Sequence, residues 1–319
     1  MTGFNADWLT LREPFDAAAR AVAWPTLVPQ VDAIRPPPTT GAPAPLRVLD
    51  LACGTGANLR ALAPRLGGAQ IWQLVDHDPA LLAALPQAMV RWADQHGYRL
   101  DIGHRDGTGL CAEGPGFIAE LVTVCADLGG GLAGITIGLP QLVTASALLD
   151  LVSAHWLENL IRDACGAGAA VLCTLTVDGR TEWDPPDTAD AAVHRLFALH
   201  QRRDKGFGPA LGPSAGPHAG RCLTDAHYTV VRADSDWVID AAGGRPHAPA
   251  MLAAMIEGMA GAAITQQPEA FDTVRAWQAR RMALISHTRL RVGHQDLMAV
   301  PTRLPGPDPT TGRSPSETP

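Results

Sequence analysis

The sequence predicts an α/β protein with a doubly wound, mainly parallel sheet. Two mainly apolar runs of strand length, 46–51 and 71–75, are each followed by an expected helix. A glycine turn opens the first helix, and apolar residues at helical spacing indicate the second. Further strand-like runs alternate with helical segments up to about residue 177. This alternation is typical of βαβ units, which place helices on both faces of a parallel sheet.

Length, charge and cysteine content limit the function classes. The chain has 319 residues, 46% of them hydrophobic, which is enough for one large domain with a substantial core or for two small domains. A formal net charge of −7 provides no basic field for phosphates, so we expect no nucleic-acid partner. The six cysteines form no CxxC pair, which predicts neither a metal site nor a disulfide framework. The chain begins without a signal-peptide pattern and has no apolar run of about 18 residues, so we expect a cytoplasmic protein without a membrane partner.

Residues 1–45 are expected to form an N-terminal helical cap and a Pro-rich linker. Trp8, Leu11 and Phe15 recur at helical spacing, and the Pro-rich stretch 35–45 ends that pattern. Residues 46–180 form the expected Rossmann-like core. Its expected strands are 46–51, 71–75, 121–126, 142–144 and 170–175, and a helix is expected at 154–164.

After Val177 the alternation of strands and helices stops. A polar loop is expected over 181–187, a helix over 188–203 and a Gly/Pro-rich stretch over 206–220. Residues 181–225 are therefore predicted to be an insertion, or lid, on the substrate side of the sheet. Residues 226–300 are expected to complete the sheet with strands and helices, and the Pro-, Thr- and Ser-rich residues 301–319 to be a disordered tail.

The most informative segment is VLDLACGTGANLR, residues 48–60. A buried strand delivers Asp50, and a turn with Gly54 and Gly56 then opens a helix, where glycine allows a ligand to approach the backbone closely. Asp76 ends the next strand, where a carboxylate can accept both hydroxyls of a ribose. Together these features predict a nucleotide-type ligand rather than an ordinary strand, turn and helix.

Nicotinamide cofactors use the same layout but need a third glycine, three residues after the second. Leu59 occupies that position. Asp50 also suits the ammonium group of an amino-acid moiety better than a pyrophosphate. The sequence therefore argues against a nicotinamide-dependent oxidoreductase.

The segment 50–56 resembles the acidic, Gly-rich first motif of the class I S-adenosylmethionine (SAM)-dependent methyltransferases, and LVDHDP, residues 74–79, resembles their second. The resemblance covers about residues 48–177. The flanking segments LREP and DKGFG resemble an uncharacterised branch of the superfamily. The resemblance implies a seven-stranded Rossmann-like methyltransferase sheet, SAM as the cofactor and methyl transfer as the reaction.

The same resemblance implies roles for single residues. Asp76 would hold the ribose, and His77 would pack near the adenine. Asp127, beside Leu128, resembles the acid that contacts the adenine amino group, and Asp106 is a competitor in a similar setting. The remaining cofactor-side residues are Asp50, Ala52 in place of the usual first glycine, Cys53, Gly54, Gly56 and, after the fourth strand, Ser146.

Substrate-side candidates come from the insertion. His200 shares the apolar face of the helix expected over 188–203, which makes it a candidate general base, although a buried histidine with a structural role is equally consistent. Arg203 and Lys205 precede a flexible Gly-Phe-Gly stretch and are candidates to bind an anionic substrate group from a lid. A solvated helix end is the alternative.

Two further substrate-side candidates lie in other segments. Arg12 belongs to the LREP segment, where it could instead pair with Glu13, and Asp150 follows the fourth strand, where it could simply be solvated. The sequence predicts a SAM-dependent methyltransferase acting on a small-molecule substrate, which could be anionic. Methylation of a protein or RNA and non-catalytic binding of SAM or S-adenosylhomocysteine (SAH) are the alternatives, and the acceptor atom and oligomeric state stay open.

Overall fold

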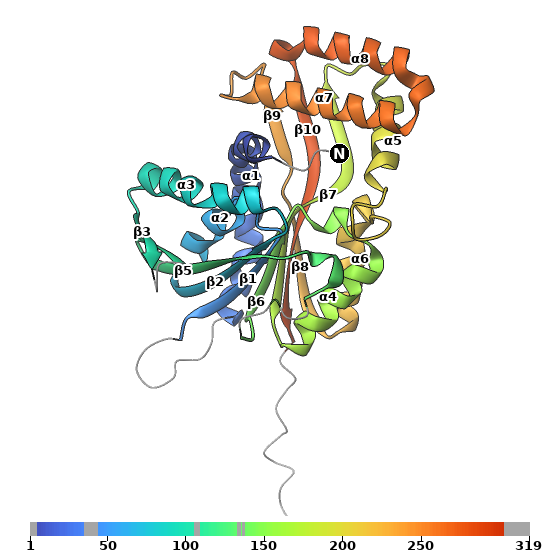
Figure 1. Ribbon diagram of the computed structural model, residues 1–319. Helices are drawn as coiled ribbons and strands as arrows, with labels where there is room; N and C mark the ends of the chain where they lie inside the picture. The colour runs from blue at the N-terminus through green and yellow to red at the C-terminus, as the bar shows by residue number, and fades with distance from the viewer. Residues whose placement is uncertain (1–4, 35–43, 105–108, 133–134, 136–137, 303–319) are drawn as a thin grey trace, which may run out of the picture.

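The computed structural model describes residues 5–34, 44–104, 109–132, 135 and 138–302. The α/β, doubly wound fold is confirmed, with one correction in strand number. The sheet has ten strands rather than seven, in the order β3-β4-β5-β2-β1-β6-β7-β10-β8, with β9 paired to β10 (Figure 1). The strands are β1 (Leu46–Leu51), β2 (Gly68–Asp76), β3 (Arg99–His104), β4 (Gly109–Gly114), β5 (Phe117–Cys125), β6 (Leu142–Ser146), β7 (Ala170–Asp184), β8 (Tyr228–Asp234), β9 (Trp237–Asp240) and β10 (Arg289–Pro301).

The centre of the sheet is parallel. β1 pairs with β2 on one side and with β6 on the other, and β5 and β7 continue these two halves. The strand order therefore reverses at β1, and ligands of open α/β sheets bind outside the carboxyl ends of the strands at such a point. β10 runs antiparallel between β7 and β8, and the antiparallel hairpin β3–β4 extends the opposite edge.

Helices cover both faces of the sheet. α1, α2 and α3 lie on one side in Figure 1, and α4 and α6 lie on the other. Each set encloses a core of its own: Trp72 and Met89 belong to the first, Trp156 and Leu160 to the second. The helices are α1 (Ala6–Leu27), α2 (Ala57–Leu66), α3 (Pro79–His96), α4 (Ala154–Gly166), α5 (Asp190–Gln201), α6 (Ala215–Asp225), α7 (Ala248–Gln266) and α8 (Phe271–Ala283), with 3₁₀ turns η1 (Val28–Gln30), η2 (Asp32–Ile34), η3 (Leu128–Gly130), η4 (Leu149–Leu151), η5 (Gly212–Ser214), η6 (Pro268–Ala270) and η7 (Ile285–His287).

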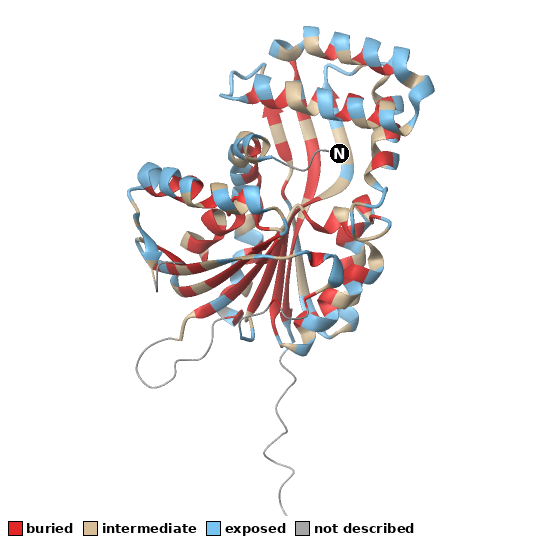
Figure 2. Ribbon diagram, viewed as in Figure 1, coloured by how far each residue is buried: buried red, intermediate tan, exposed pale blue. Residues whose placement is uncertain are grey.

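A third core lies where β7 and β10 extend beyond the body of the sheet. β7 has 15 residues and β10 has 13, and their extensions pair through Leu290 and Trp183. α5, α7 and α8 pack around these extensions, and Figure 2 shows buried residues along them. Among the described helices, α7 is the one long and apolar enough to cross a membrane, and one of its faces is buried in this core.

The predicted loop over 181–187 is wrong in its first half. Thr181 to Trp183 continue β7 because they pair with residues 290–292 of β10. The Gly/Pro-rich stretch 206–220 is also more ordered than expected, since α6 begins at Ala215. Ala219 and Leu223 bury one side of this helix in the core beneath α4, and this packing outweighs the low helix propensity of glycine and proline. The expected tail after Thr302 and most of the Pro-rich linker, 35–43, lie outside the described residues.

Candidate functional site

The Gly-rich turn forms at the carboxyl end of β1, at the point where the strand order reverses. Ala52, Gly54 and Gly56 all have positive φ angles, of 52°, 55° and 83°. Gly56 is the N-cap of α2, and its amide donates to the carbonyl of Cys53 at 2.9 Å. The Cys53 side chain is buried, and burial raises the pKa of its thiol, so the structure gives it no reactive character.

Asp76, at the end of β2, holds this turn in place. Its Oδ2 accepts the Gly54 amide at 2.7 Å, and its Oδ1 accepts the Asp78 amide at 3.0 Å. Both carboxylate oxygens thus have backbone donors, and Asp76 holds the glycine turn in its conformation.

Asp50 is a fully buried carboxylate with one unsatisfied oxygen. Its Oδ1 accepts a hydrogen bond from the Asn58 side chain at 2.8 Å, while its Oδ2 has no partner. Burial raises the Asp50 pKa to about 7, against the opposing effect of the Asn58 hydrogen bond and the Arg20 charge. A buried oxygen without a donor is costly, so this position is suited to a cationic hydrogen-bond donor.

Arg20 is the counter-charge of this site, and sequence reasoning missed it. Its Nη2 donates to Ser146 Oγ at 2.6 Å and lies 3.4 Å from Asn58 Oδ1 and 3.5 Å from Thr174 Oγ1. Burial lowers its pKa, while the Asp16, Asp296 and Asp50 charges raise it. Asn58 therefore bridges a buried cation and a buried carboxylate.

A spacing of four residues could have revealed Arg20. One face of α1 carries Arg12, Asp16 and Arg20 at a spacing of four residues, with Phe15 close beside them. Charges that alternate in sign at this spacing usually indicate a face exposed to solvent. The structure instead buries all three charged residues, because this face lies against the sheet. The charge alternation was visible in the sequence, whereas its burial depends on tertiary packing.

α1 covers the carboxyl edge of the sheet. The Glu13 carboxylate accepts hydrogen bonds from Nε and Nη2 of Arg60, at 2.8 Å and 2.7 Å. Leu9 Cδ1 lies 2.9 Å from the point where a Cβ on Gly54 would stand. The glycine cradle is therefore filled by a side chain of α1. The Asp50 carboxylate can accept a hydrogen bond from an ammonium group, but Leu9 occupies the space over Gly54. A ligand that packs against this turn therefore requires the Leu9 end of α1 to move.

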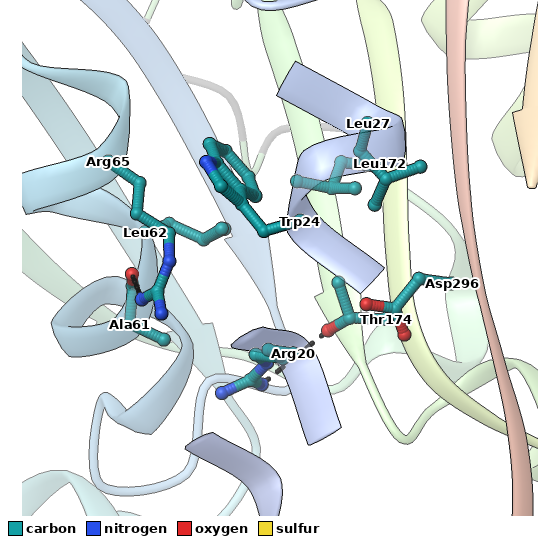
Figure 3. Close-up of a pocket in the computed structure, with 9 residues that line it drawn as sticks. All are labelled: Arg20, Trp24, Leu27, Ala61, Leu62, Arg65, Leu172, Thr174 and Asp296. Atoms are coloured by element: carbon teal, nitrogen blue, oxygen red, sulfur yellow. Dashed lines mark hydrogen bonds between the residues drawn. The ribbon is translucent and has the colours of Figure 1, made fainter. Parts of the chain in front are cut away.

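A small cavity beside Arg20 does not provide space for a nucleotide. Figure 3 shows it between α1, α2 and the β7–β10 pair, with Trp24 and Leu62 among its apolar walls and Asp296 beside Arg20. It has room for about one water molecule, far less than a nucleotide needs.

The adenine-side candidates lie at the ends of β2 and β5. The Ala126 amide donates to the carbonyl of Asp76, which brings the exposed Asp127 next to that strand end, and Asp127 caps η3 through the Gly129 amide at 2.8 Å. Leu128 is buried in the core beneath α4, and the His77 side chain is 76% exposed. Asp106, the competitor of Asp127, lies outside the described residues.

Asp150 and Arg12 lie close enough for their charges to interact. Asp150, in η4 after β6, is buried with Oδ1 unpaired, and burial raises its pKa to about 6 against the opposing effect of Arg12. Arg12 does not pair with Glu13, the alternative drawn from the sequence. It pairs with Asp16 at 2.9 Å and stacks over the Trp237 ring at 4.8 Å.

The substrate-side candidates of the insertion do not gather at this edge. His200 is buried at the end of α5, and burial and the charges of Lys205 and Arg203 lower its pKa. Within the described part of the chain, no hydrogen bond or ion pair joins His200 to the ends of β1 and β2. Arg203 donates to the Thr265 carbonyl of α7 at 3.3 Å, and Lys205 donates to the carbonyl of His200 at 3.4 Å.

The Gly-Phe-Gly stretch that follows does reach η3, beside the candidate residue Asp127. Phe207 packs edge-on against Trp156, with ring centroids 5.3 Å apart, and the Gly206 carbonyl lies 3.2 Å from the point where a Cβ on Gly129 would stand. Asp204 Oδ1 accepts the amides of Gly206 and Gly208 and so fixes the turn. The stretch expected to form a lid thus lies beside η3, while its preceding cations point elsewhere.

No protein-family model and no curated protein matches the chain. Several solved structures resemble it at low sequence identity. A SAM-dependent methyltransferase from Geobacter sulfurreducens in complex with SAH is 16% identical over 91% of this chain and 98% of that chain, with a TM-score of 0.40. A cyclopropane-fatty-acyl-phospholipid synthase-like protein from Lactobacillus casei is 16% identical over 92% and 94%, with a TM-score of 0.43. A SAM-dependent methyltransferase from Thiobacillus denitrificans, also in complex with SAH, is 16% identical over 85% and 90%, with a TM-score of 0.37.

Proposed function

We propose that the chain is a SAM-dependent methyltransferase that acts on a small-molecule acceptor. The observation that carries the proposal is Asp50 Oδ2, a fully buried carboxylate oxygen without a partner at the point where the strand order reverses. An amino-acid ammonium group satisfies this oxygen, and Arg20, bridged to Asp50 by Asn58, offers a cation for the matching carboxylate. The glycine turn and Asp76 then stand on the ribose side.

The bound cofactor would supply an electrophilic methyl group on a sulfonium. The protein's part is to orient donor and acceptor in line and to exclude water. Ser146 Oγ, at the end of β6, is held by Arg20, and the unpaired Asp150 Oδ1 follows in η4. β6 pairs with β1 on the side opposite β2, so both groups lie on the side of Asp50 away from Asp76. Asp150, with a pKa of about 6, can accept a proton or a hydrogen bond from an acceptor hydroxyl or amine near neutral pH.

The cationic side chains that were candidates to bind an anionic acceptor have other partners in the structure. Arg12 is paired with Asp16, and Arg203 and Lys205 point away from the strand edge. An acceptor with an ionisable proton, bound by Asp150, therefore fits better than one that depends on a basic patch. A screen of small hydroxyl and amine compounds should include both neutral and anionic members, together with peptide and RNA pools for the macromolecular alternative.

Calorimetric titration with SAM, SAH and NADH tests the cofactor assignment. We expect SAM and SAH to bind and NADH not to bind. Asp50→Asn is expected to weaken SAM binding by about 10- to 100-fold, because a charge-assisted hydrogen bond contributes roughly 1.5–3 kcal/mol. Asp94→Asn, an exposed carboxylate of α3, is the matched control. Binding of NADH alone, or unchanged SAM affinity in Asp50→Asn, would contradict the proposal.

A further inference from the structure

Three metal-ligating side chains meet on the surface of α4 and α6, on the side of the sheet opposite α2 and α3. Glu158 of α4 and His218 and Cys222 of α6 place one ligand atom each within 4.8 Å of the other two. Glu158 Oε1 lies 3.0 Å from His218 Nε2, and Cys222 Sγ lies 3.7 Å from the same nitrogen. His218 Nε2 is therefore the central atom of the group.

The helices dictate this meeting. His218 and Cys222 are four residues apart, so they share one face of α6. The apolar sides of α4 and α6 pack together over the sheet through Leu157, Ala219 and Leu223. This packing holds Glu158 beside the polar edge of α6, so two rigid helices position the three ligand atoms without any loop.

The donor set and its spacing suit zinc. Thiolate, imidazole and carboxylate are the protein ligands of Zn²⁺, and tetrahedral coordination at about 2.0–2.3 Å places neighbouring ligand atoms roughly 3.3–3.8 Å apart. The 3.7 Å from Cys222 Sγ to His218 Nε2 lies within this range, and the 3.0 Å from Glu158 Oε1 to the same nitrogen lies just below it. The ligand atoms of Glu158 and Cys222 lie within 4.8 Å of each other, so small side-chain rotations bring all three atoms to the tetrahedral spacing. Calcium and magnesium prefer all-oxygen sites and are disfavoured by the thiol.

We propose that Glu158, His218 and Cys222 bind one Zn²⁺ ion, with solvent as the fourth ligand, and that the ion joins α4 to α6. The site lies apart from the ends of β1 and β2, and it does not depend on the proposed methyl transfer. Neither the CxxC pattern nor HxxxH spacing reveals it, because its ligands come from two helices 60 residues apart in the chain.

A simple ion pair between Glu158 and His218 is the alternative. Such a pair at a partly exposed position contributes little stability, and it involves Glu158 and His218 but not Cys222 Sγ, which lies 3.7 Å from the same imidazole nitrogen. The positive charge of Arg221 opposes a cation here, with Nη2 3.5 Å from His218 Nδ1. Arg221 is exposed, so its side chain can turn into solvent when the ion binds.

Metal titration of the chelator-treated full-length chain tests the proposal. We expect one equivalent of Zn²⁺ to bind by calorimetry, and Co²⁺ to give a thiolate-to-cobalt charge-transfer absorption. Cys222→Ser should abolish that absorption, and Glu158→Gln and His218→Gln should each weaken Zn²⁺ binding by more than about tenfold. Arg221→Gln should leave binding unchanged or strengthen it.

Matched controls lie on α4 itself. Cys165→Ser removes a half-buried thiol and His155→Gln an exposed imidazole outside the group, and both should bind Zn²⁺ like the wild type. The thermal midpoint should rise on adding Zn²⁺ in the wild type and in both controls, but not in Glu158→Gln, whose surface position preserves folding. Equal Zn²⁺ affinity in the wild type and Glu158→Gln, or Co²⁺ absorption that survives Cys222→Ser, would overturn the proposal.

Discussion

At the scale of single residues, Ala52 is an alanine where the backbone favours glycine. Its φ angle of 52° costs an L-residue roughly 1 kcal/mol, which glycine does not incur. Ala52→Gly should therefore raise the free energy of unfolding by up to about 1 kcal/mol, as measured by urea denaturation. The residue that the resemblance marked as a departure is thus also a place of backbone strain.

Ala61→Gly provides the opposite control. Ala61 lies inside α2 with ordinary helical geometry, so glycine should cost about 1 kcal/mol there. If both variants lose stability, glycine at residue 52 costs more in the unfolded chain than it gains in the turn.

Asp50 should make stability depend on pH. Its pKa is about 7 in the folded protein, compared with 3.8 in the unfolded chain, so the folded state holds the proton more tightly between these values. Its contribution to stability is fully present below pH 3.8 and is lost as the pH rises through about 7. Relative to Asp50→Asn, the wild type should lose stability over this window, by an amount on the order of 4 kcal/mol at most.

Measuring the free energy of unfolding of both proteins between about pH 4.5 and 8 checks this. His294, whose pKa burial lowers to about 4, acts in the opposite direction, but it is present in both proteins and so cancels in the comparison. Parallel curves would mean that Asp50 remains charged throughout, and its unpaired oxygen would then have a donor in solution.

At the scale of secondary-structure elements, α1 should control access to the site. Glu13→Gln breaks the paired contact with Arg60, so residues 6–16 should exchange backbone amide hydrogens faster. Because Leu9 fills the space over Gly54, a looser α1 should also raise the association rate of SAM several-fold, as stopped-flow measurements would show.

The matched control for Glu13→Gln is Asp7→Asn, in the exposed first turn of the same helix. It should change neither the exchange nor the association rate by more than a small factor. Faster exchange in Glu13→Gln with an unchanged association rate would show that SAM enters by a route that α1 does not cover.

The elements also show how far the sequence could predict this structure. β1, β2 and the start of α3 followed from apolar runs and from Asp78 with Pro79, because these signals are local. The extension of β7 through Thr181 to Trp183 could not be predicted in this way. Thr181 and Glu182 are polar and Trp183 is the buried residue among them, so the segment shows no local strand pattern. It forms a strand because β10, more than 100 residues later, pairs with it.

In the candidate site, too, local sequence signals predicted some residues, while residues that depend on long-range contacts were missed. Asp50, Gly54 and Asp76 were predicted from their positions at strand ends and lie together at one edge. Arg20 and Asn58 were not predicted as site residues. Their roles depend on contacts between distant parts of the chain, since Arg20 contacts Asn58, 38 residues away, and Ser146, 126 residues away. His200 followed correctly from periodicity as a buried residue, but burial alone did not indicate which core it faced.

At the scale of the whole molecule, β7 and β10 join the third core to the body of the sheet. Because both strands run without interruption from one part into the other, the extension should not unfold on its own. Ile256→Ala, on the fully buried face of α7, should lower the free energy of unfolding by about 2–5 kcal/mol while leaving a single transition.

Coincidence of two probes checks this coupling. Far-ultraviolet circular dichroism reports all helices, and fluorescence of a variant that retains Trp183 and Trp277 as its only tryptophans reports the third core. Glu257→Ala, the exposed neighbour on α7, should shift stability by no more than about 0.5 kcal/mol. If fluorescence changes at a lower denaturant concentration than circular dichroism in Ile256→Ala, the third core opens separately. The third core would then be able to move while the glycine turn of the sheet remains folded.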